Sequence, residues 1–283
     1  MDIVTEVSPA DAARVEQSEH AELVAFDANR VLVGIVNRHA ADVPLDDRRV
    51  RQALNLAVDK DRVIAEGLAG HANPLVAMRP SWCSGFPPEA KPYLRDPERA
   101  RALLEEAGWP EGVALRLVTP GDFEGVAKLV AADVEDALGL AVELIVVPPE
   151  QLPAGARALV EKKLELPWHV LMHFWFDLSS EVPPAAVHRE FFGSDGAFRA
   201  GPEVPQFDRP FASLAAETDP ERVVPAAERL DELVFDEALG LFLCAPRALY
   251  AVNRHVRFAP YRTTFELAET GVTEDHWSRR DGS

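Results

Sequence analysis

Two histidines in the second half of the chain, His169 and His173, are spaced so that both could lie on one face of a strand. Neutral imidazole is a common zinc ligand, so this pair is the first candidate for metal chemistry. A zincin motif, however, needs a helix and a glutamate directly after the first histidine, whereas Val170 follows His169 within a predicted strand. Nothing nearby completes a ligand set, so the sequence predicts neither a metal site nor a cofactor.

Three aromatic residues and an acid, Phe174, Trp175, Phe176 and Asp177, end the same predicted strand. Open α/β sheets place ligand contacts at the carboxyl ends of their strands. A carboxylate suits such a place because a charge-assisted hydrogen bond in a dry cleft is strong and directional. We therefore predict a ligand-binding segment here. The alternative is that the aromatic side chains are buried in a core and that Asp177 only ends the strand.

No residue constellation for nucleophilic or acid-base catalysis is evident. Ser84 and Ser194 stand in glycine-containing turn sequences rather than in a Gly-x-Ser-x-Gly elbow. Asp46 and Asp47 are adjacent and are explained by helix capping. No glycine-rich phosphate loop follows a predicted strand. We predict no catalytic residues and a protein that is not an enzyme.

Alternating strand and helix patterns would position these residues. The order strand, helix, strand, helix, strand over residues 113–176, with short connections, predicts an α/β fold with a parallel or mixed sheet flanked by helices. A proline-rich loop is expected over 74–92, and a loose polar tail from Thr270. The predicted strands are 22–26, 30–36, 113–118, 141–147, 169–176, 239–244 and 248–252, and the predicted helices are 8–18, 59–68, 97–107, 123–138, 149–163, 184–192, 207–216 and 220–237.

A further helix is predicted in the stretch PLDDRRVRQALNLAVDK, which runs from Pro44 to Lys60. Asp46 or Asp47 can cap it. Apolar residues recur at helical spacing and predict one buried stripe: Val50, Ala53, Leu54, Ala57 and Val58. The polar positions between them are expected to point outward or to lie at the margins of that stripe: Arg49, Arg51 and Gln52.

Length, composition and charge limit the class of protein. With 283 residues, of which 47% are apolar, the chain can build one large or two smaller domains. A net charge of −18 disfavours electrostatic binding to nucleic acid or to anionic membranes. No apolar run approaches the length of about 18 residues that a membrane span needs. Cys83 and Cys244 are too few for a disulfide framework, so we expect two thiols, with a bridge as the alternative.

Two blocks of the sequence resemble a known family. The stretch from Pro44 to Lys60 resembles the Asp-x-Arg-x-Arg-Gln-Ala-Leu-x-x-Ala-x-Asp-Arg block of the family 5 extracellular solute-binding proteins, which serve peptide, nickel and related ABC importers. The stretch YLRDPERARALLEEAGW, from Tyr93 to Trp109, resembles their second block, at about the family's spacing. The closing strands of the family resemble ALYAVNRHVRF, which ends at Phe258.

The resemblance implies a fold and a domain organisation. Family members consist of two lobes that close on a ligand, and this chain resembles the second lobe. By that analogy residues 37–237 form a periplasmic-binding-protein-like lobe. Residues 1–36 then belong to the hinge or the first lobe, and residues 238–283 return to the first lobe and end in the polar tail. The first lobe itself would be missing.

The resemblance also implies ligand contacts. In peptide-binding relatives a Gly-Trp-x-x-Asp segment corresponds to Phe174–Asp177, where the backbone pairs with an extended peptide and the Asp accepts its α-ammonium. Here the spacing is Trp-x-Asp and Phe174 replaces the glycine. Asn37 resembles the family's Phe-Asn turn and joins the predicted ligand-binding residues.

The function that follows is capture of a small peptide or another small polar solute, without turnover, and its delivery to an ABC permease. The partners implied are the solute, the permease and the missing first lobe, with no nucleic acid and no insertion into a membrane. The family is extracytoplasmic, in the periplasm or at the cell surface. The amino terminus shows no signal peptide, so a complete chain would be cytoplasmic. The alternative function is a cytoplasmic sensor or interaction module derived from such a lobe.

Overall fold

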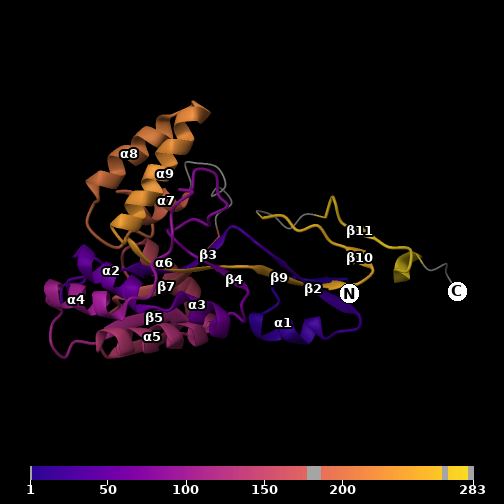
Figure 1. Cartoon of the computed structure of the whole chain (residues 1–283), viewed down its shortest axis with the longest axis horizontal. Coiled ribbons are helices and arrows are strands. Elements are labelled where there is room, and N and C mark those ends of the chain that lie inside the picture. The colour runs from indigo at the N-terminus through magenta and orange to yellow at the C-terminus, as the bar shows by residue number, and fades with distance from the viewer. Residues whose placement is uncertain (1, 177–185, 263–266, 280–283) are drawn as a thin grey trace.

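A mixed six-stranded sheet forms the centre of the molecule (Figure 1). The structure is a computed structural model that describes residues 2–176, 186–262 and 267–279. Helices cover both faces of the sheet, so the predicted α/β fold with a mixed sheet is confirmed. In spatial order the strands are β4 (Ala72–Pro74), β8 (Gly240–Pro246), β3 (Arg30–Val36), β7 (Val170–Phe176), β5 (Leu115–Pro120) and β6 (Val142–Val147).

Three of these strands are parallel, and this part of the sheet positions the candidate site. β5 pairs with both β6 and β7 in parallel, and the chain passes between them through α5 (Glu124–Leu138) and α6 (Leu152–Val160). The carboxyl ends of the three strands therefore meet at one edge of the sheet. β5 begins two residues later than predicted because Pro110–Val113 forms a turn, in which Gly112 has a φ of 74°.

The other part of the sheet is antiparallel and closely packed. β3 lies between β7 and β8 and pairs with both in antiparallel fashion. A Cβ atom on Gly34, in the middle of β3, would come within 2.6 Å of Val170 Cγ1 and 2.9 Å of Leu241 Cβ. Only glycine fits between these two side chains, so the packing of three strands depends on this residue.

One face of the sheet, here called the α2 face, is covered by α2 (Arg48–Ala57), α4 (Pro97–Ala107) and α5. The side chain of Asp47 caps α2 by accepting from the Arg49 backbone N–H, and Gly108 ends α4 with a φ of 73°. The predicted helix over 59–68 is α3 (Lys60–Arg62) followed by a π-helical turn (Val63–Gly67). The predicted apolar stripe of α2 is confirmed, since all five of its residues are buried.

The prediction for Arg51 was wrong. Its side chain is only 3% exposed and hydrogen-bonds the backbone carbonyls of Leu45, Asp46, Glu237 and Ala238. Burial lowers the pKa of this guanidinium to about 10. The helical pattern places Arg51 at the margin of the apolar stripe. That margin is covered by the carboxyl end of α9 (Pro220–Asp236), where the carbonyls of Glu237 and Ala238 accept hydrogen bonds from Arg51.

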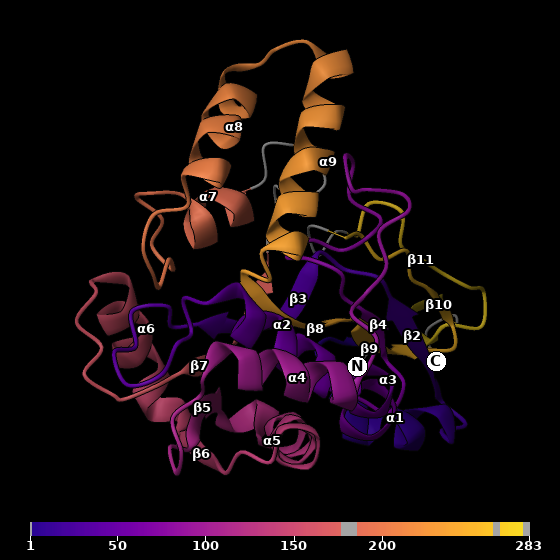
Figure 2. The same ribbon diagram turned by 60° about the vertical axis from the view of Figure 1, so that its left-hand side comes forward.

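The other face, here called the α9 face, carries α6, α7 (Ala186–Phe192), α8 (Pro205–Ala216) and α9 (Pro220–Asp236). α8 and α9 stand away from the sheet as a long helical pair (Figure 2). A buried ionic cluster joins this pair to the body of the molecule. Asp231 of α9 accepts hydrogen bonds from the Arg79 guanidinium and lies 2.9 Å from His188 Nε2 of α7, and none of the three is more than 1% exposed.

A second, three-stranded sheet extends from the body and contains the N-terminal strand (Figure 1). It contains β1 (Ile3–Val4), β9 (Ala248–Asn253) and β2 (Ala21–Phe26), and α1 (Pro9–Glu16) lies beside it. The short strands β10 (Val256–Arg257) and β11 (Gly271–Val272) pair nearby.

The predicted loose tail from Thr270 is thus partly wrong. β11 and a 3-10 turn (Trp277–Arg279) are ordered, and Asp2 accepts a hydrogen bond from the Trp277 indole.

The strands of the central sheet extend beyond the lobe predicted from the sequence. β3 and β8 belong to the central sheet, although both lie outside the predicted lobe of 37–237. Boundaries drawn along the sheet would fall before Arg30 and after Pro246. Cys83 and Cys244 are both buried as thiols, as expected.

Candidate functional site

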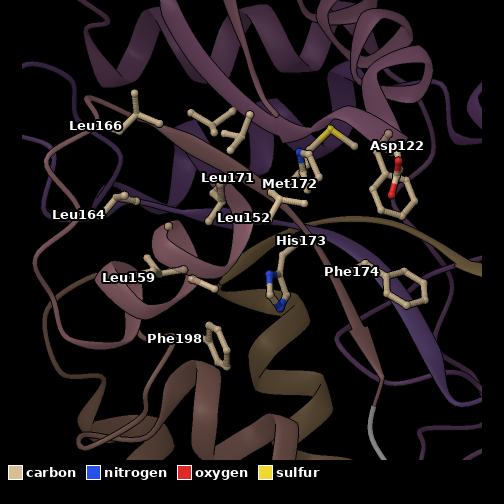
Figure 3. Close-up of a pocket in the computed structure, with 16 residues that line it drawn as sticks. Asp122, Leu152, Leu159, Leu164, Leu166, Leu171, Met172, His173, Phe174 and Phe198 are labelled. Carbon is tan, nitrogen blue, oxygen red and sulfur yellow. The ribbon is translucent and has the colours of Figure 1, made fainter. Parts of the chain in front are cut away.

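A pocket of about 290 Å³ lies at the edge where β5, β6 and β7 end (Figure 3). We call it the apolar pocket. The strands contribute Val118, Val147 and Leu171. The opposite wall comes from α6 and the segment after it: Leu152, Gly155, Ala156, Leu159, Leu164 and Leu166. The position is the one where open α/β sheets bind ligands.

Aromatic rings close two sides of the apolar pocket. Phe174 of β7 stacks on Phe123 with ring centroids 5.8 Å apart, and Arg30 lies over the Phe174 ring at 5.7 Å. Phe198 forms a second side, on the loop that follows α7. Among the described residues that line the pocket, only Asp122 and His173 carry titratable side chains. The pocket therefore offers a largely apolar surface with one acid and one imidazole.

The His173 imidazole sits among aromatic rings. Its ring centroid lies 5.0 Å from that of Phe198 and 5.7 Å from that of Phe191. Burial lowers the pKa of His173 to about 4, because a charged imidazolium would lose its hydration there. At neutral pH the side chain is uncharged and keeps both a donor and an acceptor nitrogen.

A lysine fixes the loop that carries Phe198. The Lys162 ammonium, just after α6, donates to the backbone carbonyls of Gly196, Ala197 and Arg199 at 3.1, 2.6 and 2.8 Å. Burial lowers the pKa of this ammonium group. Three charge-assisted hydrogen bonds from one atom hold two segments that are more than 30 residues apart. Lys162 therefore ties the end of α6 to the loop that forms another wall of the apolar pocket.

The strand divides the predicted ligand segment between its two faces. Phe174 lines the apolar pocket beside Phe123, whereas Trp175 packs edge-on against Phe191 and Phe198 on the α9 face, where Phe198 also lines the pocket. Phe176, the next residue, is 43% exposed at the end of the strand. Asp177 lies outside the described residues. The alternative of buried aromatic packing thus describes Trp175, while Phe174 and Phe176 are placed where a ligand could contact them.

Asn37 lies at the opposite end of the sheet. β3 and β7 are antiparallel, so Arg30 pairs with Phe176 while Val36, just before Asn37, pairs with Val170. The Asn37 amide donates to the Trp168 carbonyl at 3.0 Å and its oxygen accepts from the His39 N–H. The structure therefore does not bring Asn37 together with the other predicted ligand residues.

The two histidines are also separated. His169, fully buried just before β7, accepts from the Arg116 backbone N–H through Nδ1 and lies 3.2 Å from Asp42 Oδ1 through Nε2. Burial lowers the pKa of His169. His173 lies further along the strand in the apolar pocket. Within residues 2–176, 186–262 and 267–279, no group of three or more His, Cys, Asp and Glu residues could hold a metal ion.

Sequence reasoning missed most of the apolar pocket. Asp122 follows β5 in a Pro-Gly-Asp turn, so the rule that marked Phe174 could also have marked it. Gly155, Lys162 and Phe198 give no such local signal, because their role depends on segments that meet only in the folded chain.

Comparison with known proteins points to one family. A model of the bacterial extracellular solute-binding proteins, family 5, middle, matches residues 1–189. The dipeptide-binding protein of Escherichia coli K12 is 36% identical over 110 residues, which are 39% of this chain and 20% of that protein. The glutathione-binding protein GsiB of Pectobacterium atrosepticum is 24% identical over 285 residues, covering 94% of this chain and 52% of the relative.

Solved structures share the fold. The ABC transporter substrate binding protein CtaP of Listeria monocytogenes superposes with a TM-score of 0.84 at 17% identity, over 97% of this chain and 56% of that one. The periplasmic binding protein DppA of Helicobacter pylori, solved with the peptide STSA, gives a TM-score of 0.77 at 17% identity, over 93% of this chain and 50% of that one. The chain thus spans about half the length of these relatives.

Proposed function

The chain belongs to the bacterial extracellular solute-binding proteins of family 5, and from this membership we propose that it captures a small peptide or a similar polar solute for an ABC importer. The ligand would be bound and released without chemical change. A permease of the importer would receive it, outside the cytoplasm. No helix in the described ranges is long and apolar enough to cross a membrane.

The observation that carries this proposal is the position of the apolar pocket. It opens at the carboxyl edge of three parallel strands, beside the exposed end of β7 at Phe176. A peptide lying along this edge could place its backbone at the end of β7 and a side chain in the pocket. Phe174, Phe176 and Asp177 are the proposed contacts, and Asp177 would accept the α-ammonium.

We propose further that this chain supplies one half of the ligand cleft. The body formed by the six-stranded sheet would be the ligand-binding lobe, and the three-stranded sheet around β9 would join it to a first lobe. Closure of two lobes would bury the ligand, because each lobe then adds contacts that exist only in the closed state. The length of the relatives supports this arrangement.

Isothermal titration calorimetry of the chain tests the proposal. Peptides of two to five residues are titrated to millimolar concentration, with sugars and metal chelates as comparison ligands. The expected result is saturable heat with peptides alone. Heat with a sugar but with no peptide, or no saturable heat with any ligand, would overturn the assignment to peptide capture.

A further inference from the structure

We propose that the apolar pocket selects peptides by taking up one uncharged, apolar side chain, about the size of leucine or phenylalanine. This inference rests on the proposed function and adds a specificity to it. It concerns the part of the site that this chain itself contains, so it does not depend on contacts from another lobe.

The size of the apolar pocket fits one side chain rather than a whole ligand. Its volume of about 290 Å³ is at the lower limit of the roughly 300–1,000 Å³ of pockets that hold complete small molecules. It is about twice the ~150 Å³ of an engineered apolar cavity that binds benzene. A leucine or phenylalanine side chain therefore fits, and an alanine methyl group would leave most of the space unfilled.

The lining decides which side chains are favoured. Leucine side chains from α6 and from the segment after it line the pocket on the side of His173 and Phe198, and Phe174 lies on the other side of β7 (Figure 3). An apolar side chain would exchange water contact for contact with these carbon atoms. A charged side chain would lose its hydration, and within residues 2–176, 186–262 and 267–279 the lining offers no cation to pair with an acidic one.

The two titratable groups of the lining reinforce this selection. Asp122 is an acid at the exposed rim and opposes entry of a second carboxylate. His173 lies deeper, beside Phe198, and burial keeps its imidazole uncharged at neutral pH. A neutral imidazole edge tolerates an aliphatic or aromatic neighbour, whereas an imidazolium would favour an anion.

Contacts among the protein's own residues hold the walls of the apolar pocket together. Lys162 holds the Phe198 loop against the end of α6 through three carbonyl groups, and the stacked rings of Phe123 and Phe174 hold the other side. A pocket that is fixed in this way loses little conformational entropy on binding, so filling it contributes directly to affinity.

A single glycine allows the pocket to be filled by mutation. Gly155 lines it from α6, and a Cβ atom at this position would meet no heavy atom within 4 Å. Gly155→Leu places an apolar side chain in the space, and leucine favours a helix more than glycine does, so the fold should tolerate the change. Gly125→Leu is a matched control, because Gly125 lies on the exposed side of α5 and also has open space around it.

The test compares tripeptides that differ only in the central residue: Ala-Ala-Ala, Ala-Leu-Ala, Ala-Phe-Ala, Ala-Asp-Ala and Ala-Lys-Ala. Isothermal titration calorimetry measures each Kd with the wild type, Gly155→Leu and Gly125→Leu. We expect the wild type and Gly125→Leu to bind Ala-Leu-Ala at least about tenfold more tightly than Ala-Ala-Ala, and the charged peptides most weakly. Gly155→Leu should bind Ala-Ala-Ala and Ala-Leu-Ala with equal affinity.

Two outcomes would overturn the inference separately from the proposed function. If the wild type binds all five peptides equally, peptide capture stands and the selection by the pocket is wrong. The same conclusion follows if Gly155→Leu keeps the preference for leucine. If no peptide binds, the proposed function fails.

A methyl NMR titration of the wild type and Gly155→Leu with N-acetyl-leucinamide then examines the pocket alone. The proposal that the pocket takes up an apolar side chain is supported if the Leu159 and Leu164 methyl signals of the wild type shift and those of the variant do not. It is contradicted if neither set of signals shifts.

Discussion

The two faces of the six-stranded sheet use buried polar groups in different ways. On the α2 face, polar side chains bond to backbone carbonyls: Arg51 to four of them, and Lys60 to those of Asn55 and Tyr93. On the α9 face, Arg79 and Lys162 also donate to backbone carbonyls, but the fully buried Asp231 pairs with two other side chains, and the apolar pocket opens beside Phe198. The first arrangement fixes the path of the backbone, and the second fixes the relative positions of separate helices.

This difference explains why the sequence reveals the family but not the ligand. Both sequence blocks that resemble the family, Pro44–Lys60 and Tyr93–Trp109, form or join helices of the α2 face. Asn55 within the first block donates to the Gly240 carbonyl and accepts from the Phe242 N–H, so even its polar positions serve the sheet. The pocket lies elsewhere. These two blocks therefore describe packing, and among the described residues that line the pocket only Phe174 lies in a segment that resembles the family.

The largest effect is expected from breaking the ionic cluster of the α9 face. Asp231→Asn removes the carboxylate that faces Arg79 and His188 in a cluster of which no member is more than 1% exposed. Losing one partner of a buried charge pair typically costs about 3–5 kcal/mol of unfolding free energy. Urea unfolding should show this loss, whereas Glu232→Gln, at the exposed neighbouring position, should change the midpoint little. Equal midpoints for both variants would mean that the cluster does not stabilise the α9 face.

A smaller loss is expected from the carbonyl contacts of the α2 face. Arg51→Lys keeps the charge but cannot reach two pairs of carbonyl groups on different segments, so about 2–3 kcal/mol should be lost. Arg48→Lys, at a side chain that is 54% exposed, is the control and should cost less than about 0.5 kcal/mol. The tripeptide preference should be the same in both variants. A changed preference would show that the α2 face also influences the ligand.

The buried imidazole of the pocket predicts a pH effect on the α9 face. Because the pKa of His173 is about 4 when folded and near its ordinary value of about 6.5 when unfolded, the unfolded chain binds more protons between these values. Stability therefore falls as the pH drops through this range. Relative to His173→Gln, the wild type should lose about 2 kcal/mol of unfolding free energy between pH 7 and pH 5. Parallel pH profiles of the two proteins would contradict the burial of a neutral imidazole.

The smallest effect is expected from the buried lysine of the α2 face. Burial lowers the pKa of Lys60 to about 8, against about 10.5 in the unfolded chain. The unfolded chain again binds more protons, here between pH 8 and 10.5, so stability rises as the pH increases. Relative to Lys60→Met, the wild type should gain about 1 kcal/mol between pH 7 and pH 9 in urea unfolding. No relative gain would show that the ammonium group keeps its hydration.

The sequence predicts local structure well where the cause is local. Asp47, one of the two residues predicted to cap its helix, does so, and Asp96 and Asp219 cap the helices predicted over 97–107 and 220–237; all three side chains accept from backbone N–H groups of the first turn. Strands β2 and β3 follow the runs of β-branched and apolar residues within one residue of the predicted limits. Helix caps and strand limits of this kind are set by neighbouring residues in the sequence, and contacts with distant segments do not change them here.

The site was predicted only in part, since it depends on distant segments. The rule for strand ends places Phe174 and Phe176 correctly at the carboxyl edge, but it cannot tell which of them lines a cavity. Asn37 was grouped with them by resemblance, and the antiparallel pairing of β3 with β7 separates them. Lys162 carries no local signal in the sequence, because its role depends on carbonyl groups of a loop more than 30 residues away.

The pairing of β2 with β9 has a practical consequence. Phe26, where β2 ends, is directly opposite Ala248, where β9 begins, so the chain enters and leaves the six-stranded body at neighbouring points. Segments with adjacent ends can be inserted into the hairpin of another protein. We expect that residues 27–247 can be inserted into a hairpin of a fluorescent protein or of an enzyme. The fluorescence or activity of that host would then report on ligand binding to the inserted segment.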